Sequence, residues 1–131
     1  MEPDAIIFAL KRRGVDVRVS DGRLILEYAE NVQVDDIKGE LKKKASEVIE
    51  YLNRLSEVQG RFALALQKHV VKVGLERIDF NTGTVELTEA EIALDEAMSA
   101  YAMGEGSIEH VQFAFNRWRK AITLPEISIA V

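Results

Sequence analysis

The sequence predicts an α+β fold, in which a short β-hairpin interrupts helical sequence near the N-terminus and a mostly helical half follows. Two observations carry this prediction. The stretch GVDVRVSDGRLILEY, residues 14–28, alternates apolar and polar residues on both sides of Asp21-Gly22, a pair that suits a two-residue hairpin turn. On both flanks of this stretch, apolar residues recur every three or four positions, which is the period of a helix.

The N-terminal half is expected to follow the order α-β-β-α-α. A first helix over residues 3–13 begins at a proline, which suits the first helical turn, and ends in three cations followed by Gly14. Helical spacing continues through residues 36–73, where Gly39 and Gly60 leave open whether the segment forms one helix or two. The hairpin turn fixes a register with its apolar pairs on one face: Val19 with Leu24, Val17 with Leu26 and Val15 with Tyr28.

The C-terminal half is expected to hold a second hairpin and an antiparallel helix pair. The second hairpin is predicted over residues 77–87, and the helix pair over residues 88–122. Thr88 and Glu91 have capping-box spacing for the first helix of the pair, and Ser107 suits the N-cap of the second. The alternating tail after Pro125, residues 126–131, is expected to pair as a strand with the second hairpin; an edge in another subunit and a free terminus are the alternatives. Two domains follow from this division, residues 1–55 and residues 56–131.

Composition bounds the function. With 47% hydrophobic and 30% charged residues and a net charge of -5, the chain is expected to be a cytoplasmic protein that does not enter membranes. It has no cysteine, and His69 and His110 lie on different predicted helices. No group of Asp, Glu or His matches a catalytic or metal-binding pattern. The sequence therefore predicts no enzyme activity, no metal site and no cofactor.

Short hydrophobic motifs in residues 3–55 occur in a characteristic order. They are Ile7, Leu10, Arg13-Gly14-Val15, the ribbon Val17 to Leu26 with its Gly22-Arg23-Leu24, and then Leu41, Ile49 and Leu52. In this order they resemble the TubC-type N-terminal docking domain of nonribosomal peptide and polyketide assembly lines. The resemblance covers about two fifths of the chain.

The resemblance implies an α-β-β-α-α fold, often a homodimer, whose exposed ribbon edge accepts a C-terminal peptide segment of another protein as an extra strand. An unpaired strand edge carries N–H and C=O groups that strand addition satisfies. The predicted function is therefore a non-enzymatic protein-protein docking module. The positions expected to bind the partner are Arg18, Arg23, Leu24, Ile25, Leu26 and Glu27, with Lys42 and Lys43 to attract an acidic segment.

The first helix also predicts a homodimer. Residues 5–10 are all apolar, and a small two-stranded domain is expected to leave part of this surface uncovered. A symmetric pairing of two such helices would hide it from water. The predicted dimer contacts are Ile6, Ile7, Phe8 and Leu10.

The alternative function is a nucleic-acid-associated accessory protein of a mobile element. It would use the basic end of the last helix, where cations flank an aromatic ring that can stack on a base. Residues 56–131 hold seven basic and eleven acidic residues, so nucleic acid is the less favoured partner. The residues of the basic end are Arg117, Trp118, Arg119 and Lys120.

Overall fold

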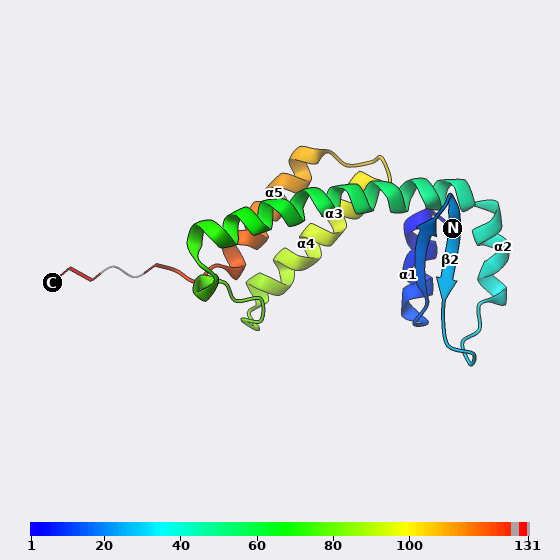
Figure 1. Ribbon diagram of the computed structural model, residues 1–131, viewed down its shortest axis with the longest axis horizontal. Helices are drawn as coiled ribbons and strands as arrows, with labels where there is room; N and C mark the ends of the chain where they lie inside the picture. The colour runs from blue at the N-terminus through cyan, green and yellow to red at the C-terminus, as the bar shows by residue number, and fades with distance from the viewer. Residues whose placement is uncertain (127–128, 131) are drawn as a thin grey trace.

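The structure of the protein is a computed structural model that describes residues 1–126, 129 and 130. It has the predicted α+β fold and element order, with one two-stranded antiparallel sheet. Figure 1 shows an elongated molecule in which the long helix α3 runs along much of its length. The elements are α1 (Pro3–Arg12), β1 (Asp16–Ser20), β2 (Arg23–Glu27), α2 (Asp35–Lys43), α3 (Ala45–Val73), a 3-10 turn (Leu75–Arg77), α4 (Val85–Ala102) and α5 (Ile108–Ile122).

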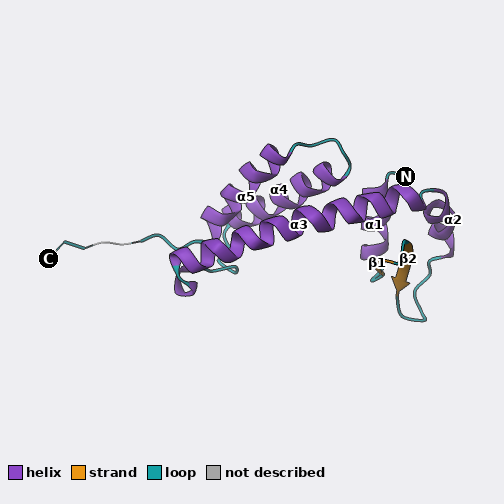
Figure 2. Ribbon diagram, turned by 45° about the horizontal axis from the view of Figure 1, so that its top comes forward, coloured by secondary structure: helices purple, strands orange, loops and turns teal. Residues whose placement is uncertain are grey.

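The two ends of α3 carry different neighbours. Helices α1 and α2 and the hairpin gather at the N-terminal end of α3, whereas α4 and α5 lie against its C-terminal part (Figures 1 and 2). Two buried clusters correspond to these two groups. The first cluster consists of Ile6, Ile7, Leu10, Val15, Val34, Ile37, Leu41, Val48, Tyr51 and Ala102. The second cluster consists of Val58, Phe62, Leu94, Ala97, Met98, Val111, Ala114 and Phe115.

The hairpin has the predicted register. Val17 pairs with Leu26 and Val19 with Leu24, and the turn residues Asp21 and Gly22 have positive φ angles of 51° and 72°. Val17, Leu24 and Leu26 pack against the first cluster, because one face of the ribbon lies on the helices.

The prediction is wrong at the open end of the hairpin. Val15 is buried, but Tyr28 lies beyond the last pair of the ladder and is 42% exposed. The chain leaves the ribbon after Glu27 and turns into the loop that leads to α2, so Tyr28 no longer follows the alternation of the strand.

Residues 35–73 form two helices, and the break lies at Lys44 rather than at a glycine. Gly39 lies within α2 and Gly60 within α3, both in unbroken helix. The change of direction at Lys44 lets α2 and α3 pack different sides of the first cluster, through Ile37 and Val48 among others. At Gly60, the burial of Val58 and Phe62 outweighs the cost of about 1 kcal/mol for an interior glycine.

The second hairpin is absent from the described residues. The 3-10 turn and a loop occupy most of residues 75–84, and α4 begins at Val85. Thr84 is the N-cap, since its hydroxyl accepts a hydrogen bond of 3.2 Å from the Leu87 N–H. The residues that looked like a second strand therefore form the first turn of α4, and the predicted capping box at Thr88 lies one turn too late. Thr88 donates its hydroxyl to the Thr84 carbonyl instead.

The antiparallel pair α4–α5 is present, and Ser107 caps α5 by accepting from the His110 N–H. Directly after α5, Thr123 forms an isolated antiparallel bridge with Ile78, the residue that follows the 3-10 turn. Strand-like pairing thus occurs before Pro125. The predicted tail strand falls partly on residues 127, 128 and 131, which lie outside the described residues.

Over the described part of the chain, no helix combines the length and the apolar character needed to cross a lipid bilayer.

Replacing Gly60 with alanine should raise the free energy of unfolding by about 1 kcal/mol, because alanine is the better helix former. Gly60 is exposed within α3, and a Cβ atom at this position would meet no heavy atom within 4 Å. Urea denaturation measures the change. The matched control Gly104→Ala should destabilise the protein, since Gly104 has a φ angle of +81°. A destabilising Gly60→Ala would contradict an unbroken α3.

Candidate functional site

The ribbon has two outer edges. In a hairpin with a two-residue turn, the pair next to the turn is hydrogen-bonded, and bonded and non-bonded pairs then alternate. The observed register makes Ser20–Arg23, Arg18–Ile25 and Asp16–Glu27 the bonded pairs. The N–H and C=O groups of the residues between them point outward: Val17 and Val19 on β1, and Leu24 and Leu26 on β2.

These outward backbone groups have no partner elsewhere in the described chain. The backbone hydrogen bonds outside regular elements include none from residues 16–28. Within residues 1–126, 129 and 130, the sheet contains only β1 and β2. Both edges are therefore left to water or to a binding partner.

A hollow of about 350 Å³ lies beside the outer edge of β1; we call it the ribbon hollow. On the ribbon it is lined by Val17, Arg18 and Val19, and by no residue of β2. Consecutive strand residues point to opposite faces, so a hollow that contacts all three of these residues lies at the edge of the strand rather than under one face. The remaining lining residues come from α1 and α3: Ile7, Lys11, Leu52, Asn53, Leu55, Ser56 and Gln59.

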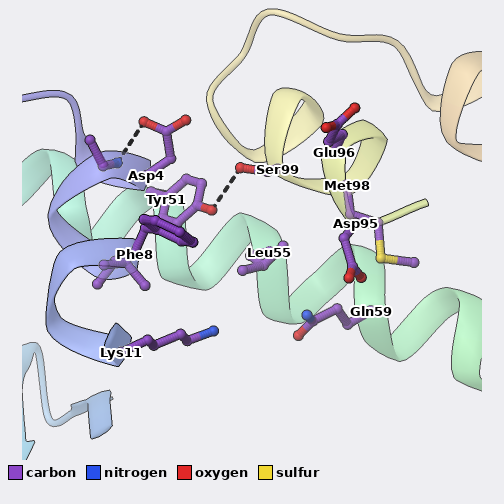
Figure 3. Close-up of a pocket in the computed structure, with 12 residues that line it drawn as sticks. Asp4, Phe8, Lys11, Tyr51, Leu55, Gln59, Asp95, Glu96, Met98 and Ser99 are labelled. Atoms are coloured by element: carbon purple, nitrogen blue, oxygen red, sulfur yellow. Dashed lines mark hydrogen bonds between the residues drawn. The ribbon is translucent and has the colours of Figure 1, made fainter. Parts of the chain in front are cut away.

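The ribbon hollow continues into a wider groove of about 610 Å³ between α1, α3 and α4, which we call the α1–α4 groove. The two share Ile7, Lys11, Leu55 and Gln59. Figure 3 shows that Lys11 extends from α1 toward the side of the groove that carries Gln59 and Asp95. An extended chain that follows β1 would therefore lie beside a surface that carries both apolar and polar side chains.

The α1–α4 groove is held together by a hydrogen bond and carries acidic groups. The hydroxyls of Tyr51 and Ser99 are 2.9 Å apart, which ties α3 to α4 (Figure 3). Asp4, Asp95 and Glu96 line the groove. Partial burial and the nearby Glu91 raise the pKa of Asp95 above its usual value, while Lys11 acts in the opposite direction.

Most of the predicted partner-binding residues lie on β2, away from the ribbon hollow. Arg23 and Glu27 are exposed, and the side chains of Leu24, Ile25 and Leu26 are half-buried. Of the predicted set, only Arg18 lines the hollow, where its Nε donates to Glu27 across the strands at 3.1 Å.

Lys42 and Lys43 form the exposed last turn of α2. Neither takes part in an ion pair within the described residues. They are free to interact with an acidic segment, but they belong to a different element from the walls of the ribbon hollow.

Arg13 has a structural role that the sequence did not indicate: it links α1 to the start of α2. Its guanidinium forms two hydrogen bonds to the Asp36 carboxylate, of 2.7 and 2.8 Å, and a third of 3.1 Å to the Gln33 carbonyl. The hydrogen bonds from Arg13 lower the pKa of Asp36. This pair joins the end of α1 to the first turn of α2.

The predicted dimer residues of α1 divide into two groups. Ile6, Ile7 and Leu10 are at most 4% exposed, because α2, α3 and the ribbon of the same chain cover them. Phe8 is 63% exposed and lines the α1–α4 groove. Three of the four predicted dimer residues are therefore covered within one chain and need no second copy to hide them, whereas Phe8 is accessible to another molecule.

The basic end of α5 does not present four free residues. Arg117 donates to the Glu89 carboxylate of α4 at 3.3 Å. Trp118 is half-buried between Phe80 and Phe115, with ring centroids 6.1 and 6.0 Å away, so its ring is part of the packing of the helix pair. Arg119 and Lys120 instead face a separate hollow between α3 and α5.

No family model, curated protein or solved structure matches the chain.

The two kinds of α1 residue should respond differently to truncation. Ile6→Ala should lower the free energy of unfolding by about 2–4 kcal/mol, because it leaves a cavity in the first cluster. Phe8→Ser should change it by less than about 1 kcal/mol, because most of the Phe8 ring already faces water. Chemical denaturation at two protein concentrations measures both. A large loss for Phe8→Ser that depends on protein concentration would show that Phe8 is buried between two copies.

Proposed function

We propose that this protein is a non-enzymatic docking module that binds an extended peptide segment by strand addition to its β-hairpin. The observation that carries the proposal is the ribbon hollow beside the outer edge of β1, where the backbone groups of Val17 and Val19 are unpaired. Strand addition gives affinity through main-chain hydrogen bonds and specificity through the side chains at the edge.

The structure supports β1 as the docking strand more than β2. A strand added to β1 would lie beside α1 and α3, so its side chains would enter an existing hollow and bury apolar surface there. The resemblance to TubC-type domains favoured β2, whose residues line no part of this hollow. We therefore assign the peptide to the β1 edge.

The lining of the ribbon hollow also favours a class of peptide. Ile7, Leu52 and Leu55 supply apolar surface, and Lys11 and Arg18 are the charged residues of the lining. Successive residues of an added strand face opposite sides. The preferred segment therefore alternates aliphatic residues, which face the helices, with acidic residues, which lie on the opposite face and compete with Glu27 for Arg18.

Hydrogen exchange at single amides tests strand addition directly. The probe is a synthetic eight-residue peptide in which valine alternates with glutamate. Its binding should slow the exchange of the Val17 and Val19 amides by about tenfold or more, because each becomes hydrogen-bonded, and should leave the Leu24 and Leu26 amides unchanged. Two-dimensional NMR at matched peptide concentrations measures all four amides.

Two matched controls separate the outcomes. The same peptide, N-methylated at alternate residues, keeps its side chains but loses the donors for pairing, and it should not bind. Ser56→Glu places bulk and negative charge in the ribbon hollow and should weaken binding, whereas Ser46→Glu on the exposed first turn of α3 should not. Protection of Leu24 and Leu26 alone would move the site to β2. Equal binding of the N-methylated peptide would rule out strand addition.

A further inference from the structure

A hollow of about 680 Å³ lies between α3 and α5. Its α3 residues belong to the C-terminal part of that helix, and Figure 1 shows this end of α3 far from the ribbon. We call this hollow the basic hollow. Every charged residue that lines it is basic: Lys68 and Lys72 on α3, and Arg119 and Lys120 on α5. Lys68 and Lys72 are one helical turn apart, so they point to the same side of α3.

These four cations have no acidic partner among the residues that the structure describes. None of them takes part in an ion pair within the described residues, although the whole chain has a net charge of -5. Like charges held close together repel one another, and such an arrangement is typical of sites that bind the opposite charge. No aspartate or glutamate lines the hollow, so the positive charge is confined to this part of an otherwise acidic chain.

Three contacts hold residues that line the basic hollow. The Arg119 guanidinium lies 6.0 Å from the centre of the Phe115 ring, which restricts its side chain. The Thr123 hydroxyl donates to the Arg119 carbonyl at 2.6 Å and lies 2.7 Å from His69 Nε2. Because the Thr123 hydroxyl donates its one proton to the Arg119 carbonyl, His69 Nε2 must be the donor to the Thr123 oxygen.

His69 reports the field in the hollow. Burial lowers its pKa, and the charges of Arg119, Lys72 and Arg77 lower it further. Burial and the positive charge around the imidazole therefore both favour its neutral form. A bound anion would reverse that effect and raise the pKa of His69.

We propose that the basic hollow binds a compact, multiply charged phosphate group. Four cations around one hollow match a ligand that concentrates several negative charges, as phosphate and pyrophosphate do. Lysine ammonium groups bind phosphate as point charges, and an arginine fork donates to two of its oxygens at once. The volume lies in the range of small-molecule sites.

The surroundings disfavour larger polyanions. An extended nucleic acid would reach beyond the hollow and meet a chain of net charge -5, which repels phosphates. Trp118, the only tryptophan, is packed between two phenylalanine rings and is not available for base stacking. A free phosphate or the phosphate moiety of a small metabolite fits the hollow without these conflicts.

Pyrophosphate is the probe, added to the full chain at constant ionic strength. NMR resolves the ring signals of the two histidines in the sequence, His69 and His110. Saturable binding should raise the pKa of His69 and leave the ring signals of His110 in place, because His110 lies in the exposed first turn of α5, away from the hollow. Lys72→Gln and Arg119→Gln should each weaken binding about tenfold or more. Lys38→Gln on α2 removes the same charge outside the hollow and should leave affinity within about twofold.

Separate titrations with inorganic phosphate, adenosine triphosphate and single- and double-stranded DNA distinguish the sources of the phosphate. The site is a small-ligand site if at least one free phosphate compound binds and DNA does not bind more tightly. Four results would overturn the proposal: no saturation, an equal His69 response to sodium chloride alone, equal loss of affinity in Lys38→Gln, or DNA as the tighter ligand through the same residues. Circular dichroism of each variant establishes that the loss is not unfolding.

Discussion

Helix α3 is unbroken from Ala45 to Val73 and contributes side chains to both buried clusters, so both halves of the structure pack on it. Its inward residues Val48, Tyr51, Leu55, Val58 and Phe62 follow one another at steps of three and four, so a single face of the helix is apolar throughout. The first two belong to one buried cluster and the last two to the other, and Leu55 packs against both. With about 1.5 Å of rise per residue, its 29 residues span about 43 Å. Neither cluster is complete without this helix.

The same helix leaves the β1 edge open. α3 and α1 are the nearest elements to that edge, but a helix has already used its backbone N–H and C=O groups for its own bonds. Helices can therefore cover the side chains of a strand without satisfying its edge. The result is a hollow with apolar helix side chains on one side and unpaired strand groups on the other. The phosphate site proposed at the far end rests on the same helix, since α3 supplies two of its four cations.

The sequence predicted features that depend on local periodicity and turn chemistry. The register of the hairpin followed from the alternation around Asp21-Gly22, and the cap at Ser107 followed from its position before α5. It misread positions where local signals competed. Val85 to Leu87 have strand propensity, but Thr84 caps a helix there and the burial of Leu87 favours it. No glycine or proline marks the break at Lys44, whereas Gly60 resembles a break and is not one.

The candidate sites could not be read from the sequence because each joins residues that are distant along the chain. The ribbon hollow combines Arg18 of β1 with Leu52 of α3, and the basic hollow combines Lys72 with Arg119. The residues of each pair meet only after α3 has packed against its neighbours. The apolar residues of α1 led to the prediction of a dimer because the local pattern does not show which elements bury them. In the structure they are buried by α2 and α3 of the same chain.

Native-state hydrogen exchange along α3 measures whether the two buried clusters unfold together. If this helix completes both clusters as one unit, the amides from Val48 to Phe62 should exchange only through global unfolding. Their opening free energies should agree with one another and with the value from denaturation. A step in protection near Leu55, with residues 3–52 opening at a lower free energy than residues 58–122, would contradict this account. The two halves would then be separate cooperative units joined by a helix.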